Sequence, residues 1–127
     1  MTILIVDDEA DLREVLGIQL ELAGHRVLKA ESASAAWTIL RSETVDMVLT
    51  DLRMPDGSGM VLLERIARLP DPKPRMILMT GVSEFISKQA YEAGAEAVLP
   101  KPFDWEQLEQ LLCRPATLSG KTSSPAP

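Results

Sequence analysis

Five side chains that could carry out chemistry stand at the ends of short apolar runs. Asp7 and Asp8 follow the first run, and Asp51, Thr80 and Lys101 stand at the ends of three later ones. If these runs are neighbouring parallel strands, their carboxyl ends meet at one edge of a sheet, where α/β folds place their functional groups. Aspartate is a known nucleophile that forms acyl phosphates. We therefore take Asp51 as the candidate nucleophile and the other four as its partners.

Three carboxylates in one crevice need something to offset their charge. Two like charges about 4 Å apart cost roughly 4 kcal/mol at an effective dielectric constant of 20. Either one carboxylate is protonated or cations intervene. Lys101 supplies one positive charge, and oxygen ligands without His or Cys favour Mg²⁺ as a second. A nucleophile, a metal ion, a hydroxyl and an ammonium group together suit phosphoryl transfer.

The elements that would position these residues are readable from the hydrophobic pattern. Short runs rich in β-branched and aliphatic residues predict strands at residues 2–6, 25–30, 45–50, 76–79 and 96–99. After each predicted strand, apolar residues recur at the spacing of a helix. The first predicted helix carries Leu12, Val15, Leu16 and Leu20 on one stripe and ends before Gly24. Ser32, Ser58, Ser83 and Asp104 are the predicted N-caps of the other four helices, with Gln107 completing a capping-box variant after Asp104.

This alternation of strands and helices predicts one α/β domain. The expected fold is a five-stranded parallel sheet with five helices on both faces. The second strand ends at Ala30 without a group that could do chemistry. It is therefore expected at an edge, which gives the strand order 2-1-3-4-5 with strands one and three beside the switch point.

Composition excludes several classes of protein. The chain has 127 residues, 46% hydrophobic residues and a net charge of −6 without a Lys/Arg cluster, so direct nucleic-acid binding is not expected. A single cysteine excludes an internal disulfide, and no apolar run is long enough for a membrane span. We expect a cytoplasmic domain over residues 1–113, followed by a disordered tail or truncated linker over residues 114–127.

Four motifs in order resemble the receiver domain of two-component response regulators, the CheY-like family. They are ILIVDDE at residues 3–9, TDLRMPDG at 50–57, LMTG at 78–81 and LPKPF at 99–103. The resemblance implies that Asp51 is the phosphoacceptor. It also implies that Mg²⁺ is bound directly by Asp8, Asp51 and the backbone carbonyl of Arg53, and by Asp7 through water.

The same resemblance assigns roles outside the metal site. Lys101 would hold one phosphoryl oxygen, aimed by a cis peptide bond before Pro102, and Thr80 would bond another and move inward on phosphorylation. Gly81 would leave room beside the phosphoryl group. The expected phosphodonor is a histidine kinase or a phosphotransfer protein. The chain would catalyse only its own phosphorylation and dephosphorylation, so it is not expected to be an enzyme in the usual sense.

Output is expected through the face of the fourth helix, fifth strand and fifth helix, toward an output domain or target protein. Homodimerisation through this face also occurs in the family. One departure concerns this face, because the family often carries Tyr or Phe where this chain has Val98.

Two other functions are compatible with the same residues. One is a docking receiver that acts without phosphorylation. The other is a Mg²⁺-dependent phosphohydrolase with an Asp nucleophile, which would usually need an acid two residues later, where this chain has Arg53.

Overall fold

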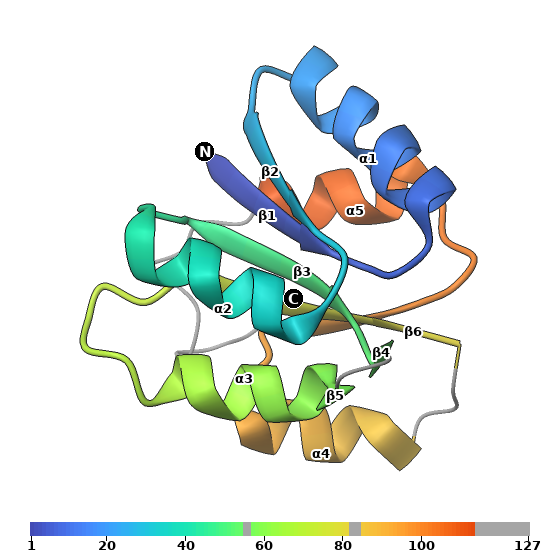
Figure 1. Ribbon diagram of the computed structural model, residues 1–127. Coiled ribbons are helices and arrows are strands. Elements are labelled where there is room, and N and C mark those ends of the chain that lie inside the picture. The colour runs from blue at the N-terminus through green and yellow to red at the C-terminus, as the bar shows by residue number, and fades with distance from the viewer. Residues whose placement is uncertain (55–56, 82–84, 114–127) are drawn as a thin grey trace.

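Five parallel strands form the central sheet of the domain (Figure 1). The fold is that of a computed structural model, which describes residues 1–54, 57–81 and 85–113, and at residues 85–87 the backbone alone. The strands are β1 (Thr2–Val6), β2 (Arg26–Ala30), β3 (Met47–Asp51), β6 (Arg75–Thr80) and β7 (Ala97–Pro100). They lie in the order β2-β1-β3-β6-β7, all parallel. The predicted order 2-1-3-4-5 is confirmed.

Helices cover both faces of the sheet, as predicted. Helices α1 (Ala10–Leu22) and α5 (Trp105–Leu112) lie on one face. Helices α2 (Ala33–Ser42), α3 (Gly59–Ala67) and α4 (Phe85–Ala93) lie on the other (Figure 1). Two separate apolar clusters result, because alternate residues of a strand face opposite sides of a sheet.

The first strand shows how the sheet divides its residues between these clusters. Ile3 and Ile5 pack with α1 and α5, whereas Leu4 and Val6 pack with α2 and α3, and all four are fully buried. A strand that is buried on both faces reads as a continuous apolar run rather than as an alternation. This is why the sequence shows unbroken runs before each polar residue of the sheet edge.

Helix caps follow the sequence closely where the structure describes them. The Ser32 hydroxyl accepts a hydrogen bond from the Ala35 N–H, and the Ser58 hydroxyl accepts one from the Met60 N–H. Gln107 Oε1 accepts the Asp104 N–H at 2.8 Å, as in the expected capping box. The predicted cap Ser83 and the tail over residues 114–127 lie outside the described residues.

One local expectation was wrong, and one local feature was not predicted. Between Asp51 and α3, β4 (Arg53–Met54) pairs antiparallel with β5 (Gly57–Ser58). Two-residue strands are too short for hydrophobic periodicity to detect. Val15 does not join the buried stripe of α1 and is 54% exposed, because the helix turns only about 100° of its surface toward the sheet.

Within the described residues, no helix is both long and apolar enough to cross a bilayer.

Candidate acidic site at the carboxyl edge of the sheet

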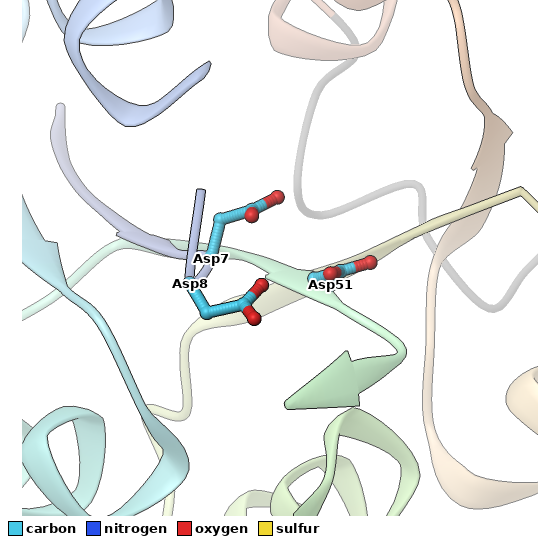
Figure 2. Close-up of side chains that lie close together, drawn as sticks. All are labelled: Asp7, Asp8 and Asp51. Carbon is cyan, nitrogen blue, oxygen red and sulfur yellow. The ribbon is translucent and has the colours of Figure 1, made fainter. Parts of the chain in front are cut away.

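The predicted site residues converge at the carboxyl ends of four strands. Asp7 and Asp8 follow β1, Asp51 ends β3, Thr80 ends β6 and Lys101 follows β7. The three carboxylates lie close together (Figure 2), and one oxygen from each lies within 4.8 Å of the other two. Parallel strands bring these residues together although up to 94 residues separate them in the chain.

Asp7 is the buried member of the acidic group. Its side chain is fully buried, and its Oδ1 accepts the Glu9 N–H at 2.8 Å. Its main-chain carbonyl accepts a hydrogen bond from the Arg13 guanidinium at 2.6 Å. Asp8, by contrast, is exposed. The two adjacent acids therefore differ in environment, and Asp8 presents its carboxylate to solvent while Asp7 is held by the protein.

Lys101 is shared between three carboxylates. Its Nζ lies 2.8 Å from Asp7 Oδ2, 3.3 Å from Asp51 Oδ1 and 3.9 Å from Glu9 Oε1. Burial by itself lowers the pKa of Lys101, but the hydrogen bonds and charges of Asp7 and Asp51 outweigh it, so that its pKa is raised. The lysine therefore stays cationic. Its peptide bond to Pro102 is cis, as the family resemblance implied.

Asp51 is half-buried and carries a perturbed carboxyl group. Burial raises its pKa above the ordinary value, the charge of Lys101 opposes this, and the charge of Asp7 raises the pKa further. The Leu52 N–H donates to Asp51 Oδ1 at 2.9 Å. Burial and like charge thus make the ionised form costly in the absence of a further cation.

Two residues that were not predicted as part of the site, Thr50 and Gly59, contact the main chain of Asp51. The Thr50 hydroxyl is buried and donates to the Asp51 main-chain carbonyl at 3.0 Å. The Gly59 backbone packs against that same carbonyl. Its N–H also donates to the Leu52 carbonyl at 2.8 Å. The sequence offered one signal for Gly59, which is a glycine at the start of a predicted helix, eight positions after the candidate nucleophile. Nothing in the sequence indicated a role for Thr50.

The remaining predicted residues surround this centre. Thr80 is almost fully buried, and its carbonyl accepts the Lys101 N–H at 2.7 Å. Gly81 is exposed with open space beside its Cα. The Arg53 side chain is exposed on β4. Val98 pairs with Leu78 in the sheet and packs, partly buried, against the apolar cluster on the α4 side.

The donor set fits a hard divalent cation. Three carboxylates with oxygens within 4.8 Å of one another are available, and two of them keep some exposure to solvent. Mg²⁺ prefers oxygen ligands and retains several waters, so a partly open carboxylate group suits it better than a closed cage.

Comparisons with known proteins agree with this geometry. Residues 3–113 match the profile of the response regulator receiver domain. The chain is 36% identical to the phosphate regulon transcriptional regulatory protein PhoB of Pseudomonas aeruginosa, over 99% of this chain and 56% of PhoB. It is 37% identical to the DNA-binding transcriptional regulator NtrC of Azospirillum brasilense, over 89% of this chain and 24% of NtrC.

A solved structure resembles the whole described fold. The response regulator TrrA of Thermotoga maritima, in complex with Mg²⁺ and BeF, superposes with a TM-score of 0.78 at 30% identity. The match covers 87% of this chain and 95% of that one. In the comparison with the two curated relatives, by contrast, the chain spans only about half of PhoB and a quarter of NtrC.

Proposed function

Because the chain belongs to the response regulator receiver family of two-component systems, we propose that Asp51 accepts a phosphoryl group from a partner protein. The observation that carries this proposal is the position of Asp51 at the end of β3, with Lys101 Nζ 3.3 Å from its carboxylate and two further acids beside it. We assign residues 1–113 to this receiver function. The donor is a histidine kinase or phosphotransfer protein that presents a phosphohistidine.

The transfer needs one oxygen of Asp51 to attack phosphorus in line. Both contacts described for its carboxylate, from the Leu52 N–H and from Lys101, are made by Oδ1. We therefore assign Oδ2 as the attacking oxygen. Its lone pair forms the O–P bond while the N–P bond of the phosphohistidine breaks. The nitrogen keeps that electron pair, and the imidazole leaves as a neutral ring when its other nitrogen carries a proton.

The charges around Asp51 support this reaction. We propose that Mg²⁺ is held by Asp8, Asp51 and the Arg53 backbone carbonyl, with Asp7 acting through water. When bound, Mg²⁺ would offset negative charge on the phosphoryl oxygens. Lys101 is cationic and already lies beside the carboxylates, so its ammonium group can bind a phosphoryl oxygen without a large movement of the side chain. Thr80, at the adjacent strand end, supplies a hydroxyl for another.

Phosphorylation would switch the domain between two conformational states, and it would not be a step in the turnover of a substrate. It adds a charge of about −1.5 to −2 at the sheet edge, and a ligand or charge shifts an equilibrium only by its differential interaction with the two states. We propose that the change reaches an output domain or target through the face of α4, β7 and α5. Tyr91 is 51% exposed on α4, one of the three elements of this face. Val98 there would respond by repacking, since it has no ring to rotate.

The test is chemical labelling of the purified chain. Incubation with Mg²⁺ and acetyl phosphate should add the mass of one phosphate, and hydroxylamine should remove it, as expected of an acyl phosphate. Asp51→Asn should abolish the adduct, whereas the matched change Asp71→Asn, at an exposed position outside the site, should not. A folded protein that gains no adduct would refute the proposal and favour a docking receiver. Steady turnover of phosphomonoesters would favour a phosphohydrolase.

A further inference from the structure

The main-chain carbonyl of Asp51 is closely packed by Thr50 and Gly59. The buried Thr50 hydroxyl donates to this oxygen at 3.0 Å. Gly59, the first residue of α3, lies against the same peptide group. A Cβ built at position 59 would overlap the Asp51 carbonyl oxygen and lie 3.0 Å from its carbonyl carbon and 3.2 Å from Thr50 Oγ1. The contact is therefore between backbones and leaves no room for a side chain.

The close approach of Gly59 to Asp51 results from the path of the chain between them. After Asp51 the chain runs out through β4 and returns through β5, and the Gly59 N–H then donates to the Leu52 carbonyl at 2.8 Å. The start of α3 is thus bonded to the residue that follows Asp51. Because the obstacle at position 59 is backbone rather than the end of a flexible side chain, an added methyl group can be accommodated only by moving the Asp51 peptide or the start of α3.

The orientation of a side chain follows from its own main chain. The direction of the Cα–Cβ bond of Asp51 sets where its carboxylate lies relative to Lys101 and to the two acids after β1. We propose that Thr50 and Gly59 are positioning residues. They hold the Asp51 peptide in place through its carbonyl group and so fix the direction of its carboxylate. The consequence for phosphoryl transfer rests on the proposed function of Asp51, whereas the orientation itself does not.

The expected effects differ between the two positions. A displacement of about 1 Å in a reacting group can cost up to about 100-fold in rate, so Gly59→Ala should slow labelling of Asp51 by up to that factor. Thr50→Val replaces the hydroxyl with a methyl group and keeps the shape of the side chain. It should slow labelling several-fold, and Thr50→Ser, which restores a hydroxyl, should recover most of the rate.

A matched control is available in α1. A Cβ at Gly17 would meet the Cε of Lys29 at 2.8 Å, which is the far end of a flexible side chain that can move aside. Gly17→Ala therefore adds the same methyl group at another buried glycine without pressing on backbone. It should leave labelling unchanged.

The experiment measures orientation and chemistry separately. The ¹³Cγ and amide resonances of Asp51 are recorded by NMR in metal-free buffer, and the labelling rate is measured against acetyl phosphate concentration with saturating Mg²⁺. In Thr50→Val and Gly59→Ala the Asp51 resonances should move and the rate at saturating donor should fall. Both should return toward wild type in Thr50→Ser and stay unchanged in Gly17→Ala.

Two results would overturn the inference. One is a folded Thr50→Val protein with unmoved Asp51 resonances and an unchanged rate. The other is a loss in Thr50→Val that Thr50→Ser does not recover. If Gly59→Ala fails to fold, the Thr50 pair decides alone. If the wild-type chain takes no label at all, the proposed function fails, and the Asp51 resonances still decide the positioning role.

Discussion

Replacing Asp51 with Asn is expected to stabilise the fold in metal-free buffer. Asn keeps an oxygen that can accept the Leu52 N–H, so the change removes charge and little else. At an effective dielectric constant of 20, a like charge at the outer limit of 4.8 Å would contribute about 3.5 kcal/mol of repulsion, and both Asp7 and Asp8 have an oxygen within that distance of Asp51. Lys101 at 3.3 Å contributes about 5 kcal/mol of attraction. On this simple count repulsion exceeds attraction by roughly 2 kcal/mol. Burial of the carboxylate, which is the largest cause of its raised pKa, adds a further cost to the ionised form.

Solvent screening at the exposed Asp8 reduces this figure. We therefore expect Asp51→Asn to raise the free energy of unfolding by about 1–2 kcal/mol at neutral pH, with a rise in Tm of a few degrees. The assay is urea unfolding followed by circular dichroism in EDTA. The control is Glu64→Gln, which removes one charge from an exposed position of α3 and should leave the stability almost unchanged.

The pH dependence of this difference gives a second, independent check. The pKa of Asp51 is raised in the folded state, chiefly by burial. As the pH falls, the folded protein therefore binds this proton before the unfolded chain does. The penalty is present at neutral pH and disappears through an acidic window that ends near the ordinary Asp pKa of 3.8. A variant that is no more stable than wild type in EDTA, or whose advantage persists unchanged below that window, would refute the reasoning.

Three further predictions concern the metal, the lysine and a distant ion pair. Mg²⁺ at 100 times its dissociation constant should stabilise the chain by about 2.7 kcal/mol, and the gain seen in thermal unfolding should vanish with EDTA and weaken in Asp8→Asn. Lys101→Met should lower the stability at neutral pH in urea unfolding, because a fully buried carboxylate loses its ammonium partner. Since the pKa of Lys101 is raised, this difference should fade only as the pH rises beyond its ordinary value of 10.5. Arg75→Met removes two hydrogen bonds to the Glu96 carboxylate, whose side chain is only 9% exposed, and should cost about 3–5 kcal/mol. Arg26→Met, in an exposed ion pair, should cost at most about 1 kcal/mol, and equal losses in the two variants would contradict the burial argument.

The sequence by itself determined the architecture and the membership of the site. Unbroken apolar runs alternating with helical spacing require strands that are buried on both faces, and short crossover helices between them require a parallel sheet. Once the sheet is parallel, every residue at a carboxyl end is brought to one edge. The hydrophobic pattern alone therefore groups Asp7, Asp8, Asp51, Thr80 and Lys101 at this edge.

Tertiary structure alone decided how those residues differ in burial and in their contacts. Adjacent acids in the sequence gave no reason for Asp7 to be buried and bonded to Lys101 while Asp8 faces solvent. That division depends on a contact across 94 residues. The fit of the Gly59 backbone against the Asp51 carbonyl depends on the path of β4 and β5, which are too short to leave a periodic signal. The local sequence pattern specifies the position of a side chain along its strand. Packing between distant segments sets its burial, its charge partners and its orientation.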